Sequence, residues 1–441
     1  MAGLGYVTLN KFNQPPLMRI STDESYCAML FDIGQRTNPF ERFQTAAQNY
    51  RGNKVVLINN LNEAVESGIT DGGILNGVPY YHISSYYDYI GDDAPLYVMF
   101  ADCSNGFDKI IDLQRAADGK LFQIGVWTER CLWTSDAETY QFTNLLSQLN
   151  AAAEELSGGI GKPTITTTPV SIILFPNTAR LQNSQYAYGS IDYRKIPYAK
   201  NLNYPKISVV LGQDGTDAVH KMQKGNVGYT PVGLMGKAMA CLYLSPAEES
   251  IGYVDNYSLS KDSLSDPVTK PELGFGFISE VIVDDDFSAL DDVSETQRNL
   301  LAVSGYIIPT TYPAKEAEVF FSNDQTLSSG DYRLISLNRV IHKCRRALKT
   351  VMMPFVNGGI STDPQTGNIT SSDVTVLTNA ILGEIDKSLV NKRGENQISE
   401  RMVTIDPSQQ ILLNDELRIE LAVIPVSISD VINVEESFST T

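Results

Sequence analysis

The side chains best suited to metal binding or nucleophilic chemistry are few and scattered in this chain of 441 residues. A structural zinc site needs closely spaced Cys or His ligands, and neither a CxxC pair nor an HExxH pair occurs. The odd number of isolated cysteines indicates buried thiols in a reducing compartment rather than a disulfide framework. The sequence therefore predicts no metal and no cofactor. The residues concerned are Cys27, Cys103, Cys131, Cys241, Cys344, His82, His220 and His342.

The glycine-rich run at residues 158–164 is the strongest candidate for a phosphate-binding loop. Leu156 stands where that motif has its first glycine, and Pro163 replaces its Ser or Thr. No GxSxG elbow and no recognisable Ser-His-Asp triad occurs. We therefore expect no catalytic residues, and the chain is not predicted to be an enzyme.

An acidic stretch lies between residues 261 and 298. It lacks the DxDxDG spacing and the distal glutamate of a calcium loop, so a solvated loop is the simpler interpretation. Its acidic residues are Asp284, Asp285, Asp286, Asp291, Asp292 and Glu295.

Overall charge and hydropathy exclude two classes of partner. The 52 acidic residues exceed the 34 basic ones, giving a net charge of -18, which opposes binding to a phosphate backbone. The longest apolar runs are far shorter than the roughly 18 residues that a spanning helix needs. We therefore predict neither nucleic-acid binding nor membrane insertion.

Apolar strands alternate with amphipathic helices through the first half of the chain. This alternation predicts a mainly parallel sheet covered on both faces, and hence an α/β fold. The tyrosine-rich stretch at residues 80–89 is expected to be an interface or local core. The expected strands are residues 26–31, 54–58, 96–100, 121–127, 170–175 and 207–211, and the expected helices are residues 60–68, 107–116, 137–156 and 231–244.

The expected helix at residues 333–355 reverses the sign of the local charge. Residues 332–362 hold six Lys or Arg and no Asp or Glu, although the chain as a whole is acidic. At about 100° per residue the cations fall on one arc and the apolar residues on the other. The arc is either an ordinary solvated face or a surface that docks on an acidic partner. Its members are Arg339, Lys343, Arg345, Arg346 and Lys349.

A second helix is expected at residues 372–392, followed by strands at 402–405 and 416–424. In the second strand Leu417, Ile419, Leu421 and Val423 alternate with polar residues. Beyond Pro425 the chain is β-branched and apolar, so it is either a frayed tail or a strand that pairs with a neighbouring subunit. The apolar residues of this end are Val426, Ile428, Val431, Ile432 and Val434.

The order of these elements from Ser336 to Ser437 resembles the contractile tail sheath proteins of bacteriophages and phage-like contractile injection systems. It comprises a basic helix, a turn containing the sequence TGNI, a second helix, two strands and an extended end. Weaker similarity lies in residues 54–68 and around residues 232–254. The middle of the chain matches nothing specific and resembles a variable insert.

The resemblance and the element pattern together predict an α/β (α+β multidomain) protein. It would have an α/β core with an inserted middle domain, a C-terminal domain of two helices and a small β-sheet, and an extended arm at each end. The expected boundaries are 1–20 for the N-terminal arm, 21–92 for the first part of the core, 93–210 for an outward-facing insert, 211–330 for the rest of the core, 331–424 for the C-terminal sheath domain and 425–441 for the C-terminal β arm.

The resemblance implies a structural subunit that polymerises as helical hexameric rings around an inner tube and contracts to drive the tube through a cell envelope. Implied partners are further copies of the chain, a tail tube protein, and baseplate and tail terminator proteins. The implied location is a virion tail or phage-like particle, assembled in the bacterial host cytoplasm. The alternatives are an α/β enzyme of unrecognised type or another phage assembly component, such as a capsid or baseplate protein.

The resemblance also assigns roles to the candidate site residues. The five cations of the basic helix would attach the subunit to the inner tube. Leu417, Ile419, Leu421 and Val423 would belong to a receiving sheet that binds the arms of neighbours. The arm residues would be Tyr6, Val7, Leu9, Val426, Ile428, Val431, Ile432 and Val434.

Overall fold

The structure is a computed structural model that describes most of the chain. The described residues are 23–41, 48–50, 53–134, 138–158, 168–178, 181–182, 193–214, 232–263, 266–267, 273–278, 287–289, 295–312, 315, 318–356, 358–390, 396–414 and 416–426. Most of the predicted arm residues therefore lie outside the described residues, as do His220, nearly all of the glycine-rich run and most of the acidic stretch. Val426 is the one predicted arm residue that is described.

An eight-stranded sheet forms the centre of the molecule, with the strand order β15-β9-β8-β5-β1-β4-β3-β2. Neighbouring strands run parallel from β15 to β4, while β3 and β2 are antiparallel additions at one edge. The predicted α/β class is thus confirmed. The strands are β1 Cys27–Asp32, β2 Gln48–Tyr50, β3 Asn53–Ile58, β4 Leu96–Ala101, β5 Gln123–Cys131, β8 Ser171–Asn177, β9 Ile207–Val210 and β15 Tyr306–Ile307.

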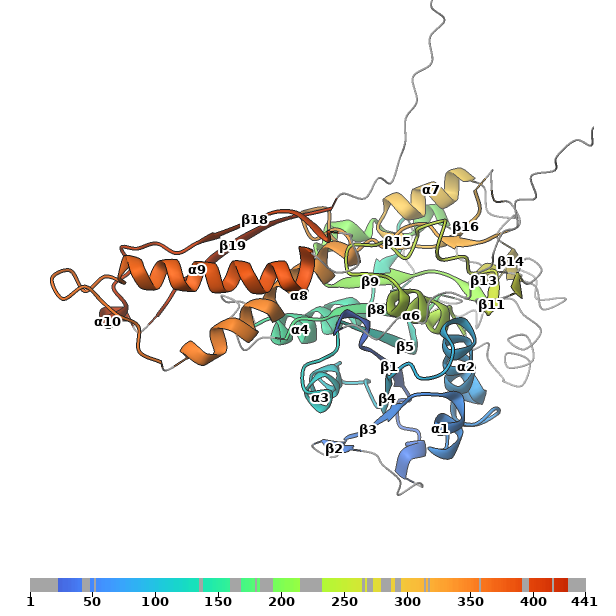
Figure 1. Cartoon of the computed structure of the whole chain (residues 1–441). Coiled ribbons are helices and arrows are strands. Elements are labelled where there is room, and N and C mark those ends of the chain that lie inside the picture. The colour runs from blue at the N-terminus through green and yellow to red at the C-terminus, as the bar shows by residue number, and fades with distance from the viewer. Residues whose placement is uncertain are drawn as a thin grey trace, which may run out of the picture.

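Helices cover both faces of this sheet, as its fully buried strands require. In Figure 1, α3 (Lys109–Ala116) and α4 (Leu145–Leu156) lie on one side of the strands, and α2 (Val78–Ile90) and α6 (Met235–Leu244) lie on the other. Tyr86, Tyr87 and Tyr89 of α2 are buried, which confirms the local-core interpretation of the tyrosine-rich stretch.

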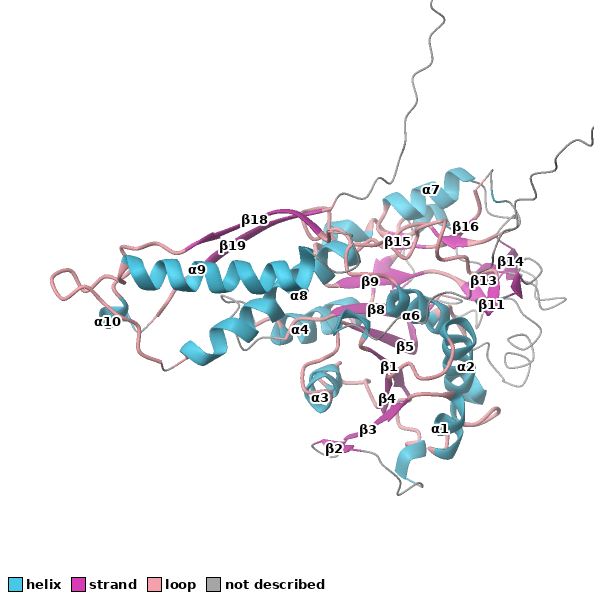
Figure 2. Cartoon of the chain, viewed as in Figure 1, coloured by secondary structure: helices cyan, strands magenta, loops and turns pink. Residues whose placement is uncertain are grey.

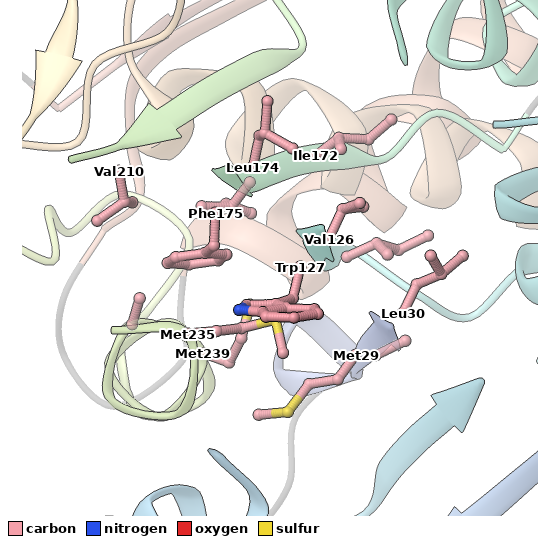
Figure 3. Packing of buried hydrophobic residues seen from close by; sticks show 14 of the residues in the cluster. Met29, Leu30, Val126, Trp127, Ile172, Leu174, Phe175, Val210, Met235 and Met239 are labelled. Carbon is pink, nitrogen blue, oxygen red and sulfur yellow. The ribbon is translucent and has the colours of Figure 1, made fainter. Parts of the chain in front are cut away.

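The fit between α6 and the sheet depends on a small residue in β5. A Cβ atom at Gly125 would lie only 3.0 Å from the sulfur of Met239 and 3.1 Å from that of Met235. Figure 3 shows both methionines beside the indole of Trp127, two residues further along β5. Even an alanine at position 125 would therefore require both methionine side chains to shift by a few tenths of an ångström.

The sheet corrects the expectation of a separate middle insert. Residues 93–210 supply β9, β8, β5 and β4 in the middle of the sheet, and β1, from outside that range, lies between β5 and β4. Parallel strands need long crossover connections, so successive strand–helix units of this range build one sheet together with β1. The boundaries expected at residues 93 and 210 consequently do not separate two hydrophobic cores.

A second, smaller unit follows in the C-terminal part of the chain and has its own hydrophobic cluster. It consists of α8 (Ile335–Met352), α9 (Ser371–Ile385) and an antiparallel ribbon of β18 (Ile398–Thr404) and β19 (Glu420–Pro425). Figures 1 and 2 show the ribbon lying along α9 and projecting to one side of the central sheet. Two helices and a small sheet are the predicted composition of this region.

Several shorter elements complete the described chain. They are α1 Leu61–Glu66, β6 Trp133–Thr134, β7 Gln141–Phe142, β10 Gln213–Asp214, β11 Lys261–Ser263, β12 Asp266–Pro267, β13 Leu273–Ile278, β14 Phe287–Ala289, α7 Glu295–Val303, β16 Pro309–Thr310, β17 Phe320–Phe321 and α10 Ile411–Asn414. Among the described residues, no helix is both long and apolar enough to cross a bilayer.

Candidate attachment and assembly site

The basic helix α8 begins inside the molecule, where Arg339 is completely buried. Its guanidinium group donates to the carbonyl oxygens of Leu242 at 3.1 Å and Ser245 at 2.9 Å, and to the hydroxyl of Ser245 at 2.6 Å. These carbonyls lie at the C-terminal end of α6, which carries partial negative charge and lacks partners within its own helix. Arg339 therefore caps α6 and joins α8 to the core.

One turn further along, Lys343 forms a buried ion pair. Its ammonium nitrogen lies 2.9 Å from a carboxylate oxygen of Glu24 and 2.7 Å from the amide oxygen of Gln397. Burial alone would raise the pKa of Glu24, but the charge and hydrogen bond of Lys343, aided by Arg339, lower that pKa to about 2. The carboxylate is therefore held ionised inside the protein.

The third cation, Arg346, packs on the start of β5. Its guanidinium carbon lies 3.9 Å from the centre of the Phe122 ring, and it donates to the carbonyl oxygen of Leu121 at 2.6 Å. A cation stacked on an aromatic face and bonded to a carbonyl is well satisfied without a second protein.

The remaining two cations of the predicted arc are placed differently. Arg345 and Lys349 are half-exposed, and no carboxylate of the described residues forms an ion pair with either. The prediction of one continuous cationic attachment face is therefore wrong for Arg339 and Lys343, which are buried, and incomplete for Arg346. A helical projection shows which residues share a face, but it does not show how much of that face the rest of the chain covers.

The same helix carries a histidine that is surrounded by positive charge. Burial, followed by Arg345, Arg346, Lys206 and Arg339, holds the pKa of His342 well below its usual range. The imidazole is therefore neutral at physiological pH.

The β18–β19 ribbon contains two of the four residues predicted for a receiving sheet, Leu421 and Val423, whereas Leu417 and Ile419 lie just before β19. Leu417, Ile419, Leu421 and Val423 are half-buried and pack against the cluster formed by α8 and α9. These side chains thus face α8 and α9, two of them from the segment before β19 and two from the ribbon. Each of its two strands has a single partner among the described residues, so their outer edges carry backbone groups able to accept further strands.

A hollow of about 350 Å³ opens near the carboxyl ends of β1 and β5 and is a second candidate site. Ligands of open α/β sheets bind at this end of the strands. However, Asp32 accepts from the backbone nitrogen of Cys103 at 3.0 Å and from the hydroxyl of Thr128 at 2.8 Å. Arg130 donates to the Cys103 carbonyl at 3.0 Å and to Gln148 at 2.8 Å. These charged groups hold loops together, and the described residues contain no cluster of metal ligands.

Two solved structures share this fold over essentially the whole chain. One is a chain of the anti-feeding prophage baseplate, 6-fold symmetrised, with a TM-score of 0.52, 11% identity and coverage of 100% of both chains. The other is a chain of the anti-feeding prophage helical sheath in its contracted state, with a TM-score of 0.53, 9% identity and coverage of 99% of both chains. This chain has the fold of a contractile sheath protein. The predicted resemblance is thereby confirmed at the level of fold.

No protein-family model and no curated protein matches the sequence. The similarity is therefore visible in the backbone and almost absent from the amino acids. Sequence analysis missed the internal partners of these cations, which are Glu24 for Lys343, the end of α6 for Arg339 and Phe122 for Arg346. The one available signal was the unusual cation density of α8 beside an apolar face, which suits burial against carbonyls as well as exposure.

Proposed function

We propose that this chain is a structural subunit of a contractile sheath, polymerising as stacked rings that shorten to drive an inner tube through an envelope. The observation that carries the proposal is the match in fold to the anti-feeding prophage sheath over 99% of both chains. Like that sheath, the subunit would act by assembly and not as an enzyme, within a phage tail or phage-like particle built in a bacterial cytoplasm.

The ribbon supplies a physical basis for joining subunits. Its two outer edges can accept strands from neighbours, and the apolar chain ends around Tyr6, Val7 and Leu9 and beyond Val426 are the proposed donors. Each added main-chain hydrogen bond contributes about 0.5 to 1.5 kcal/mol, and apolar burial adds to this. Such junctions can persist while rings rotate against one another.

The half-exposed pair of cations on α8 supplies a proposed contact for the inner tube. Arg345 and Lys349 lie one turn apart on a chain of net charge -18 and are suited to an acidic partner surface. Exposed charge pairs contribute on the order of 1 kcal/mol or less and are screened by salt. Weak tube contacts beside strong subunit junctions would allow the sheath to slide along the tube. The remaining proposed partners are baseplate and tail terminator proteins.

The direct test is negative-stain electron microscopy of the purified protein and of a variant ending at Val426. Full-length chains are expected to give hollow striated tubes, whereas the variant keeps the described fold and stays unassembled. A variant lacking only residues 439–441, which retains every apolar arm residue, is the matched control and should polymerise. Normal tubes from the chain ending at Val426 would eliminate strand donation by the C-terminal arm.

A baseplate role is the second candidate, because the anti-feeding prophage baseplate also contains a chain of this fold. The same micrographs separate the two possibilities. Rings or plates that never stack, even with a candidate tube protein present, would favour the baseplate. Long tubes of uniform width would favour the sheath.

A further inference from the structure

The two ends of the described chain meet at one buried side chain. Glu24 is preceded by 23 residues, and Val426 is followed by 15. The backbone nitrogen of Val426 donates to the carbonyl of Gln397 at 3.2 Å, and Lys343 donates to the Gln397 amide oxygen at 2.7 Å. Lys343 also donates to the Glu24 carboxylate at 2.9 Å. A continuous polar path thus joins the two ends of the described chain.

The surroundings of this path make it stiff. Glu24, Lys343 and Gln397 are 2%, 4% and 5% exposed, so water cannot replace a broken contact. Lysine is almost never fully buried unless its charge is paired, which indicates that the position of this ammonium group is fixed by its partners.

The path also connects two elements of different kinds. On one side, Glu24 leads within three residues into β1, which lies between β4 and β5 in the central sheet. On the other side, Gln397 borders β18, and the backbone of β19 ends at Pro425 beside it. A displacement of the ribbon at this end therefore acts on the segment before β1 through Lys343, whose contact lies beside the hydrogen bond from Arg339 to the Glu24 carbonyl at 3.3 Å.

We infer that Lys343 is a positioning residue that fixes the roots of both terminal segments in one arrangement, so that a load on one arm is transmitted to the other. The inference rests on the proposed sheath function for its consequence, which is that neighbouring subunits joined by the two arms keep a fixed relative geometry. The coupling between the two roots is a property of the single subunit and is measurable without any assembly.

The test measures hydrogen exchange of the full-length protein at low concentration, where it is unassembled. Glu24→Gln removes the charge on the N-terminal side, and exchange is read on the C-terminal side, at the β19 amides of residues 420–424 and at the amide of Val426 just after β19. Loss of one charge-assisted hydrogen bond is expected to accelerate their exchange about tenfold. Glu154→Gln is the matched control, because it removes another ion pair, Lys206–Glu154 at 2.9 Å, located on α4. It should leave β19 unchanged.

Unchanged exchange in β19, or acceleration spread evenly over the whole chain, would overturn the inference. The double variant Glu24→Gln with Lys343→Met guards against general loss of stability, since replacing a buried ion pair by neutral groups of similar size is often tolerated. This variant is expected to fold and to show β19 exchange as fast as in Glu24→Gln. Because each junction between subunits would lose a preformed geometry, its critical concentration for polymerisation should rise about tenfold. If this variant exchanged and polymerised like the unmodified protein, Lys343 would fill space in the core without coupling the two ends of the described chain.

The two proposals fail in different ways. If the unmodified chain never polymerises, the sheath function is wrong, while the exchange measurement still decides whether Lys343 couples the two roots. If the chain polymerises but the coupling is absent, the sheath function stands without this positioning residue.

Discussion

The five basic residues of α8 look equivalent in the sequence but divide into two groups in the structure. Arg339, Lys343 and Arg346 bind the chain's own carbonyls, carboxylate and aromatic ring. Arg345 and Lys349 are half-exposed and have no ion-pair partner among the described residues. The difference shows that a cationic helix can serve as an internal connector on one side and present charge to a partner on another.

Of the substitutions in the two groups, reversing the charge of Arg339 should lower the free energy of unfolding the most. Arg339→Glu would place a carboxylate against the carbonyl oxygens that end α6, and breaking a buried ionic contact costs about 3 to 5 kcal/mol. We expect loss of the folded state or a steep fall in the free energy of unfolding, measured by denaturant titration followed by circular dichroism.

Lys349→Glu is the control for that experiment, because a substitution on a partly exposed surface usually changes stability by less than about 0.5 kcal/mol. Similar stability in the two variants would show that Arg339 is not the cap of α6. It would also return Arg339 to the set of candidate tube contacts.

Acid should weaken the buried ion pair of Glu24 and Lys343. The pKa of Glu24 is lowered from 4.5 to about 2, so its stabilising contribution is complete above pH 4.5 and is lost as the pH falls towards 2. By linkage this contribution is about 3 kcal/mol. The lowered pKa of His342 acts in the same direction, because its contribution begins to decline below pH 6.5.

Unfolding by denaturant at pH 7, 5.5 and 3 would measure this acid sensitivity. We expect stability to fall at each step, with both steps reduced in His342→Leu and only the second reduced in the neutral pair Glu24→Gln with Lys343→Met. If both variants kept the slope of the unmodified protein, the acid sensitivity would originate elsewhere in the chain.

Arg346 lies between the two groups and should show an intermediate effect. Arg346→Gln removes the stacking on Phe122 and the charged hydrogen bond to the Leu121 carbonyl, together about 1 to 3 kcal/mol. A double-mutant cycle with Phe122→Leu isolates the stacking contribution. A coupling energy indistinguishable from zero would mean that the two side chains lie close together without stabilising each other.

The sequence was most informative where burial follows directly from local pattern. The apolar runs at residues 27–31 and 172–175 became central parallel strands, and α8 and α9 formed close to their expected bounds. Four of the five cysteines are buried, as expected. These features depend on periodicity and composition, which the chain carries locally.

The candidate site could not be predicted as well, because its contacts join residues far apart in the chain. Lys343 pairs with Glu24 across 319 positions, and Arg346 reaches Leu121 across 225. No helical projection contains such partners. For the same reason, residues 93–210 looked like an insert in sequence but supply the middle of the sheet, since strand order depends on pairing and not on sequence order.

The smallest effect on stability, and the most specific effect on function, is expected from the exposed group. Arg345→Glu with Lys349→Glu should leave the free energy of unfolding within about 1 kcal/mol of the unmodified protein, because neither side chain closes an internal ion pair in the described part of the chain. Co-assembly with the tube protein should nevertheless be lost, and assembly of the unmodified protein should weaken as salt rises. Sedimentation of tube and sheath proteins together at low and high salt would measure both effects. Arg333→Glu, which changes an exposed cation just before α8, is the matched control. If the double variant co-sedimented with the tube protein as well as this control does, the tube contact would have to lie outside α8, and the helix would remain an internal connector alone.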